Sequence, residues 1–321
     1  MKFTRRSLLM AAGALPLSGF SKLASAQQYP SRPIHIVVPA AASTSIDVTA
    51  RFFTEPLAER LGSPVVVEDK PGTGGLVAYA AGAKAAPDGY TLMIAGIPMY
   101  LLPLLSRGTA TFDPLADFAP VTRVARVSFG LVVESNSPYR SLDDLIRAMR
   151  DKPNELTYSS QGVGSAAHLC GTLLTHMSKT QAQHIPYKST ATATTDVAAG
   201  RISFTMQPGP SVLGLLQSGK LRLLAVSGSQ RWEAFPDVPT VAQAGLPDYE
   251  LSSWLDFVAP KGTPEFIIRL LDERFREIAH SPKYKAFCSD QMIFPQDEGY
   301  KELAAQMQDE AQKWKKIVAL I

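Results

Sequence analysis

The chain alternates short β-branched runs with helical segments, and this alternation limits its possible folds more than any other feature. The run Ile34–Val38 is apolar apart from one histidine, which is typical of a strand buried on both faces of a parallel sheet. A helical pattern follows at 46–61 and ends at Gly62. Strands are predicted next at 65–67 and 90–94. This βαβαβ order predicts a parallel, doubly wound α/β sheet.

The rest of the chain continues the alternation and then becomes helical. Ser141 and Asp144 predict a capping box for a helix that ends near Arg150. After the last predicted strand, an apolar stripe at helical spacing runs from Leu303 to Val318. Further strands are predicted at 121–127, 131–133, 156–159, 184–187, 202–206, 221–226 and 252–258. A chain of this length favours two lobes over one core, and strands that cross between the lobes fit better than a flexible linker.

Residues 1–26 have the layout of a secretory signal peptide. Basic residues precede an apolar run at 8–20, and the small residues at 24–26 suit a cleavage site. The pair Arg5 and Arg6 is also typical of a twin-arginine signal, so both export routes are compatible with the sequence. The apolar run is interrupted and shorter than the roughly 20 residues that a membrane span needs. The sequence therefore predicts an exported protein.

Charge and cysteine content exclude several classes of partner. Removal of the signal, which carries four basic residues and no acid, changes the formal net charge from +3 to −1. A near-neutral chain has no electrostatic footprint for nucleic acid or an anionic membrane surface. Cys170 and Cys288 lie far apart in the sequence, and their spacing fits neither a metal site nor a redox pair. An oxidising compartment would permit a disulfide, but two buried thiols are the expectation.

The sequence lacks the common catalytic motifs. No serine has glycine at both −2 and +2, and the signatures Ser-x-x-Lys, His-Glu-x-x-His, Cys-x-x-Cys and Walker A are all absent. The five histidines do not cluster in sequence, and His168 and His176 lie two helical turns apart, too far for an easy shared metal site. We therefore expect no catalytic residues, no metal and no cofactor.

Small and hydroxylated residues follow three predicted strands, in loops at 39–47, 69–75 and 159–165. In a doubly wound sheet, ligands lie beyond the carboxyl ends of strands, where loops lead into helix N-termini that favour a carboxylate or phosphate. Each loop alone also fits a structural role: its glycines suit a turn, Ser45 suits an N-cap, and Asp47 suits the first turn of a helix. Three such loops in a two-lobed exported protein favour a ligand site.

At these loops the chain resembles the substrate-binding proteins of tripartite tricarboxylate transporters, also called Bug receptors. The resemblance covers essentially the whole chain after the signal. It is carried by the segments 29–34, 68–75, 85–92, 117–121, 184–188, 219–226, 237–241 and 244–247. The resemblance implies a periplasmic receptor with the two-lobed type II "Venus flytrap" fold, doubly wound sheets and a two-strand hinge, and we expect a monomer. It implies chain crossovers near 122–128 and 248–255, with one lobe at 27–125 plus 253–321 and the other at 126–252.

The resemblance also implies a carboxylate ligand held mainly by backbone groups. The sequence departs from the family pattern at Ser43 and Thr44, which replace glycines, at Ala40, which replaces an aromatic residue, at Gln207, which replaces an acid, and at Ser189, which replaces a glycine. We hypothesise that the first loop binds one carboxylate and that the third loop closes over the rest of the ligand. The predicted ligand-binding residues are Ala42, Ser43, Thr44, Ser45, Asp47, Gly72, Thr73, Gly74, Ser160, Gly162, Gly164, Ser165, Thr190 and Gln207.

Three functions are compatible with such a chain. A transport receptor would deliver its ligand to membrane permease subunits, and a sensory receptor would present the same closed form to a signalling protein. An enzyme on the same scaffold is the third, disfavoured by the missing motifs. Trp254, near the second crossover, is expected either to stack on a ligand or to pack inside the hinge.

Overall fold

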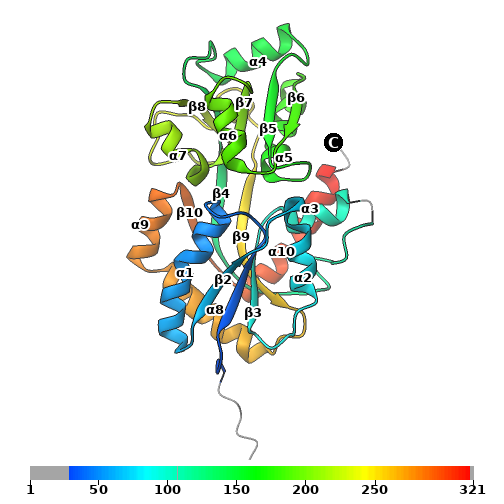
Figure 1. Cartoon of the computed structure of the whole chain (residues 1–321), viewed down its shortest axis with the longest axis vertical. Helices are drawn as coiled ribbons and strands as arrows, with labels where there is room; N and C mark the ends of the chain where they lie inside the picture. Colours follow the sequence, from blue (N-terminus) through cyan, green and yellow to red (C-terminus); the bar gives the residue numbers. More distant parts are fainter. Residues whose placement is uncertain (1–28, 107, 319–321) are drawn as a thin grey trace, which may run out of the picture.

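The computed structural model describes residues 29–106 and 108–318, which form two lobes joined by two strands (Figure 1). Sheets covered by helices make up both lobes, so the predicted two-lobed α/β fold is confirmed. The predicted signal peptide at 1–26 lies outside the described residues. In the described part of the chain, none of the helices combines the length and the apolar character that a membrane span requires.

The sheet of the first lobe has the strand order β2-β1-β3-β9-β4, and β10 pairs with β4 as well. Its strands are β1 (Ile34–Val38), β2 (Val65–Asp69), β3 (Thr91–Ala95), β4 (Phe118–Glu134), β9 (Ser252–Pro260) and β10 (Ile293–Gly299). The predicted parallel pairing holds for β1 with β2 and β3, whereas β9 and β4 run antiparallel to their neighbours.

The sheet of the second lobe uses the far half of β4, with β8 on one side and the series β7-β5-β6 on the other. Its other strands are β5 (Thr157–Ser160), β6 (Gln183–Pro186), β7 (Phe204–Pro208) and β8 (Leu221–Val226). β5 is parallel to both β6 and β7. Both lobes therefore contain a parallel βαβ portion beside antiparallel strands that connect them.

Helices cover both faces of each sheet. They are α1 (Ser45–Leu61), α2 (Leu76–Ala83), α3 (Pro98–Leu105), α4 (Leu142–Asp151), α5 (Ala166–Ser178), α6 (Thr190–Ala198), α7 (Gly209–Gln217), α8 (Glu265–Ala279), α9 (Pro282–Asp290) and α10 (Tyr300–Val318). Alternate residues of β1 enter different cores: Ile36 packs with α1, α8 and α9, whereas Val37 packs with α2, α3 and α10. The second of these cores continues into the other lobe, where it includes α4 and α5, and contains Cys170. Cys288 lies in the first core, so the two cysteines are separate buried thiols.

β4 is one strand of 17 residues, although the sequence predicted two strands at 121–127 and 131–133. The residues between these two predicted strands, 128–130, include Gly130. Gly130 instead serves packing, since a Cβ atom there would lie 2.5 Å from the ring of Trp232. The backbone also continues its pairing through this point, because Ser227 N donates to Phe129 O at 2.8 Å. β4 therefore passes from the first sheet into the second without a turn.

β10 was missed, because the sequence after β9 was expected to be entirely helical. Its seven residues include Pro295 and two acids, and little apolar alternation marks it as a strand. Such a composition is typical of an edge strand, and its pairing with β4 shifts register after Pro295. Tertiary pairing, rather than local propensity, makes this segment extended.

Candidate functional site

The first two predicted loops lie side by side at the carboxyl ends of β1 and β2. Lys70 N donates to Val38 O at 2.8 Å, which carries the pairing of the two strands into the loops. Gly75 has a φ of 102°, and a Cβ atom there would lie 2.9 Å from Pro39 Cβ and 3.0 Å from Pro39 O. Only glycine fits this left-handed position so close to another backbone. The loops at 39–47 and 69–75 therefore form one edge of the first lobe.

Asp47 holds the first loop in place from inside the lobe. Its buried carboxylate accepts hydrogen bonds from Ser43 N at 2.7 Å and from Arg51 Nε at 2.6 Å. Ser43 is left-handed, with a φ of 64°. The N-cap of α1 is Thr44, not Ser45 as expected: Thr44 Oγ1 accepts from Asp47 N, and the helix begins one residue earlier than predicted. Ser45 is buried in the first turn of the helix.

Arg51 joins the first loop to the second, since it also contacts the carboxylate of Asp69 at the end of β2. Burial raises the pKa of Asp69, and the nearby Asp47 carboxylate raises it further. The second oxygen of Asp69, Oδ1, is buried and has no hydrogen-bond partner among the described residues. An arginine between two acids thus fixes the spacing of the two loops, a role that the sequence spacing did not reveal.

The third predicted loop belongs to the second lobe and leads into α5. Ser165 is the N-cap of this helix: its Oγ accepts from His168 N at 3.3 Å and donates to Gly162 O at 2.7 Å. Ser160 Oγ accepts from Gly162 N at 3.0 Å. Gly162 and Gly164 have φ values of 108° and 84°. The loop therefore curls back on itself around two serine hydroxyls.

Gln207 supports the third loop from below. It is fully buried, its Oε1 accepts from Gln161 Nε2 at 2.9 Å, and its Nε2 donates to Thr205 Oγ1 at 3.0 Å. Thr190 lies in the first turn of α6, where Ser189 is the N-cap. The predicted site residues of the second lobe thus surround three neighbouring strand ends, those of β5, β6 and β7.

His168 and His184 lie beneath the third loop, and their proximity was not predicted from the sequence. Their ring centroids are 4.4 Å apart. Burial lowers the pKa of His168 to about 4, with a further contribution from His184, and burial also lowers the pKa of His184. The pairing of Tyr158 in β5 with His184 in β6 sets this proximity, and it was not predictable before the strand register was known.

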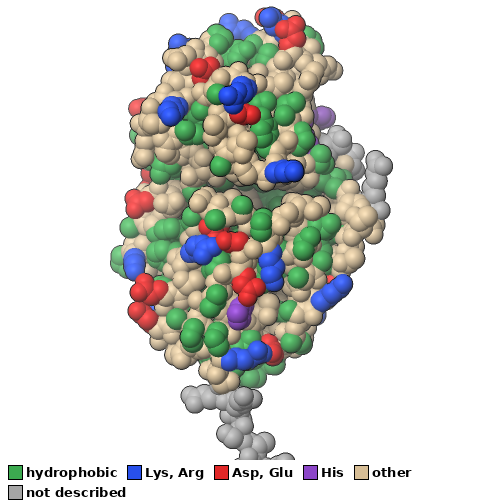
Figure 2. Space-filling view, viewed as in Figure 1, with side chains coloured by type: hydrophobic (Ala, Val, Ile, Leu, Met, Phe, Trp, Pro, Cys, Tyr) green, Lys and Arg blue, Asp and Glu red, His purple; other side chains and the backbone are tan. Residues whose placement is uncertain are grey.

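Loops of both lobes converge on α3. A Cβ atom at Gly74 would lie 3.4 Å from Leu102 Cδ2, and one at Gly164 would lie 3.8 Å from the same atom and 3.2 Å from Leu105 Cδ1. One leucine of the first lobe therefore lies next to both the second and the third predicted loops. The space-filling view shows a furrow between the two lobes (Figure 2).

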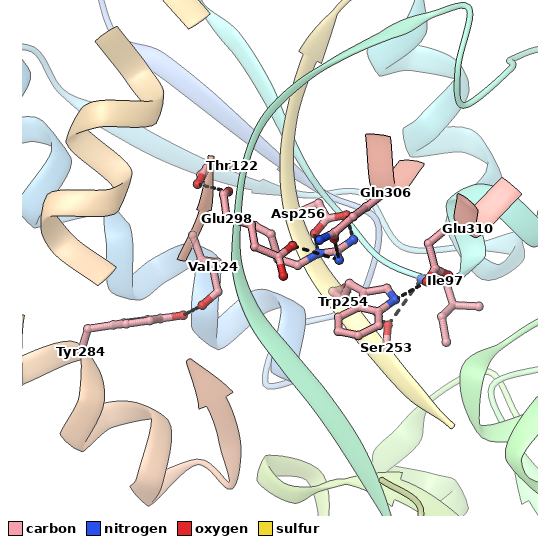
Figure 3. A network of polar contacts seen from close by, with 11 residues as sticks. Ile97, Thr122, Val124, Ser253, Trp254, Asp256, Tyr284, Glu298, Gln306 and Glu310 are labelled. Carbon is pink, nitrogen blue, oxygen red and sulfur yellow. Dashed lines mark hydrogen bonds and ion pairs between the residues drawn. The ribbon is translucent and has the colours of Figure 1, made fainter. Parts of the chain in front are cut away.

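Trp254 is half-buried and packs against the first lobe next to the hinge (Figure 3). Its indole N–H donates to Glu310 Oε1 at 2.9 Å, and the guanidinium of Arg123 lies 4.4 Å from the centre of its ring. Arg123 forms a buried two-point ion pair with Asp256, with N–O distances of 2.7 and 3.0 Å. Burial raises the pKa of Asp256, and Arg123 opposes this shift. Of the two expected roles of Trp254, these contacts match packing at the hinge.

The described residues contain no group of three or more His, Cys, Asp or Glu side chains that could hold a metal ion. The predicted loops carry backbone amides and hydroxyl groups. Such groups can bind a polar solute by hydrogen bonds.

Comparisons with known proteins identify the family of the chain. The model of the tripartite tricarboxylate transporter family receptor matches residues 49–321. BugT of Bordetella pertussis is 34% identical over 302 residues, which cover 94% of this chain and 93% of BugT. A UPF0065 protein from the gbd 5′ region of Cupriavidus necator is 34% identical over 281 residues, which cover 88% of this chain and 85% of that protein.

Solved structures extend the similarity to the fold. Rpa4515 of R. palustris, solved with adipate, has a TM-score of 0.85 at 31% identity and covers 91% of this chain and 97% of its own. MatC of Rhodopseudomonas palustris, solved with bound malate, has a TM-score of 0.83 at 26% identity and covers 90% of this chain and 100% of its own. The predicted resemblance and the periplasmic binding protein fold are therefore confirmed, and the chain belongs to the tripartite tricarboxylate transporter receptor family.

Proposed function

We propose that this chain captures a small carboxylate between its two lobes and releases it chemically unchanged. The observation that carries the proposal is the convergence of loops from both lobes on Leu102, at the ends of strands that lead into helix N-termini. Backbone N–H groups and helix N-termini favour an anion. The adipate and malate found in Rpa4515 and MatC support a carboxylate as the ligand class.

The predicted ligand-binding residues then divide into two roles. Ala42, Ser43, Thr44, Ser45, Gly72, Thr73, Gly74, Ser160, Gly162, Gly164, Ser165 and Thr190 would contact the ligand or present backbone groups to it. Asp47 and Gln207 would act through the loops, because the carboxylate oxygens of Asp47 and both ends of the Gln207 amide are already bonded within their own lobes.

Family membership supports a partner and a location for this activity. We propose that the protein works in the periplasm as a monomer and delivers its ligand to the membrane permease subunits of a tripartite transporter. Export by the secretory or the twin-arginine route would bring it there. Fractionation of cells that produce the full-length chain tests the location, and co-purification with the permease subunits tests the partner.

Thermal-shift screening followed by calorimetry tests the ligand class. The panel contains adipate, malate, monocarboxylates, tricarboxylates, aromatic acids and neutral amides of matched size. A ligand in hundredfold excess over its dissociation constant adds about 2.7 kcal/mol to the free energy of unfolding. Stabilisation by one or more carboxylates, and not by the matched amides, is the expected result. A panel in which amides stabilise as well as acids would contradict the proposal.

Two serine caps provide a matched pair of variants for locating the site. Ser165 caps α5 at the proposed site, whereas Ser141 caps α4 away from it, and each accepts a bond from the third helical residue. Replacement of either serine by alanine removes an N-cap worth about 1 kcal/mol. We expect both variants to lose similar stability, but only Ser165→Ala to weaken carboxylate binding, by tenfold or more. Equal affinities in the two variants would place the site elsewhere.

A further inference from the structure

Two imidazoles lie beneath the third loop and bond directly to it. His168 comes from the first turn of α5 and His184 from β6, and their centroids are 4.4 Å apart. Tyr158 of β5 lies against both rings, with centroid distances of 6.4 Å to His168 and 5.1 Å to His184. The pair thus sits between a helix and two strands, at the base of the loop at 159–165.

The hydrogen bond from the loop to His168 defines the protonation state of that ring. Gly164 N donates to His168 Nδ1 at 3.5 Å. An amide N–H can only donate, so Nδ1 must accept and cannot carry a proton. A neutral His168 with its proton on Nε2 is the one form that satisfies this contact. Burial favours the same neutral form, because it lowers the pKa of His168 to about 4.

His184 fixes the other end of the loop through a hydroxyl. Its Nε2 lies 2.7 Å from Ser160 Oγ, which also accepts from Gly162 N at 3.0 Å and lies 3.2 Å from Gly162 O. Rotation of the serine hydroxyl is therefore set by the ring nitrogen on one side and the loop carbonyl on the other. These bonds do not use the amides of Gln161 and Val163, which lie between the fixed points.

We propose that His168 and His184 are positioning residues of the ligand site, which hold Gly162 and Gly164 so that the intervening backbone can bind the ligand. The inference rests on the proposed function of the same loop. Packing alone does not require imidazoles here. The surroundings are already aromatic, with Tyr158 stacked on Phe204 at 5.6 Å, and an apolar side chain would fill the same space. The bonds to Gly164 N and Ser160 Oγ are what an apolar residue would lose.

Conservative and apolar variants separate positioning from packing. Asparagine at 168 keeps an acceptor near the place of Nδ1, and glutamine at 184 keeps a polar group near the place of Nε2. We expect His168→Asn and His184→Gln to bind adipate or malate within about threefold of the wild type. We expect His168→Leu and His184→Leu to weaken the same binding tenfold or more. His176→Leu is the control, because His176 is exposed in the last turn of the same helix.

Measurements on the ligand-free protein make the test independent of ligand choice. Amide exchange at Gly162 and Gly164 should accelerate tenfold or more in the leucine variants and stay near the wild-type rate in the asparagine and glutamine variants. Nitrogen NMR of the wild type should show His168 unprotonated at Nδ1. A failure of adipate and malate to bind the wild type would count against the proposed function, whereas these two readouts would still decide the positioning role.

Two results would overturn the inference. One is a wild-type His168 protonated at Nδ1 at neutral pH. The other is equal affinity and equal amide exchange in the leucine variants and their polar counterparts, which would leave the pair with a packing role alone. If a leucine variant does not fold, the NMR result and the polar variants decide the matter.

Discussion

Trp254 and Glu310 join the hinge strand β9 to the last helix, α10, through an indole N–H that donates to Oε1 at 2.9 Å. The other oxygen of Glu310 accepts from Trp314 Nε1 at 2.7 Å, so one buried carboxylate satisfies two indoles. Trp254 lies two residues after the start of β9, near the point where the chain enters the first lobe. The packing of α10 therefore constrains the strand about which the lobes would move.

Loss of the Glu310 carboxylate should lower the free energy of unfolding. Glu310→Ala leaves the buried indole N–H of Trp314 and the half-buried indole N–H of Trp254 without an acceptor, and a buried group left in this way costs about 1–3 kcal/mol. We expect a loss of about 2–4 kcal/mol in urea unfolding, whereas Glu310→Gln, which keeps one acceptor oxygen, should lose less than half of this. Asp309→Ala is the control, because Asp309 is exposed on the same helix. A loss in Glu310→Ala no larger than in the control would contradict the bridging role.

The ion pair of Arg123 and Asp256 should show strong coupling. Both side chains are almost fully buried, with exposed fractions of 2% and 4%. Removal of Arg123 leaves the Asp256 carboxylate buried without its partner, which typically costs about 3–5 kcal/mol, whereas removal of Asp256 leaves Arg123 with Glu298, whose Oε2 lies 3.2 Å from Nη1. We expect Arg123→Met to lose about this much free energy of unfolding and Asp256→Ala to lose less, and the double variant to lose clearly less than the two losses combined. Additive losses in a double-mutant cycle would show that the charges do not depend on each other.

Gly209, at the start of α7, should be essential for the approach of the two lobes. A Cβ atom there would lie 2.6 Å from Met292 Cβ and 2.8 Å from Gln291 O, both in the segment that precedes β10. We expect Gly209→Ala to reduce stability by about 1–3 kcal/mol and to increase the radius of gyration in small-angle scattering.

Gly214 provides the control on the same helix, because a Cβ atom there would meet no other atom within 4 Å. Gly214→Ala should leave the radius of gyration unchanged and add up to about 1 kcal/mol of stability. Similar scattering from the two variants would show that this contact does not set the distance between the lobes.

Acidification should lower the free energy of unfolding, because His168 is held neutral in the folded protein. Its pKa is lowered to about 4 in the folded protein, against about 6.5 in an unfolded chain. Between these values the unfolded state binds a proton that the folded state does not, so stability falls as the pH drops from 6.5 towards 4. Besides burial, the neighbouring His184 lowers the pKa of His168. Burial lowers the pKa of His184 as well.

Urea unfolding at pH 7.5, 6.5, 5.5 and 4.5 measures this dependence. The His168→Asn variant should lose less stability over this range than the wild type, by about 1–2 kcal/mol after allowance for partial contact with solvent. Carboxylates titrate in both proteins, so the difference between them isolates the histidine. Parallel pH profiles would indicate that His168 is not held neutral by the fold.

Much of the fold was predictable because periodicity and turn signals are local. β1, α1, β8 and the capping box of α4 match their predicted positions to within a residue or two. β10 and the continuity of β4 were not predictable, since Pro295 and Gly130 carry local signals that tertiary pairing overrides. The expected N-cap at Ser45 was wrong by one residue for a similar reason: Thr44 and Ser45 have equally suitable hydroxyls, and only the backbone decides which one caps the helix.

The sequence is sufficient to propose a location for the candidate site, but not to predict the contacts within it. The rule that ligands lie beyond the carboxyl ends of strands selected the three loops from the sequence. The roles of Arg51, Leu102 and His184 depend on which strands and helices become neighbours, and no spacing along the chain encodes that. Sequence analysis therefore indicates where a ligand site can form, whereas the contacts that hold its loops require the register of the sheets.

β4 lies between two neighbouring strands in each lobe: β9 and β10 flank its first part, and β7 and β8 flank its second part. Deletion of a single residue near Ser128 would turn every later side chain of this strand to the opposite face of its sheet. The two lobes are thus tied together by one strand, and any change of its length within the crossover alters the register of the sheet that follows. A graft between relatives with its junction inside β4 would have to preserve the number of residues in this strand.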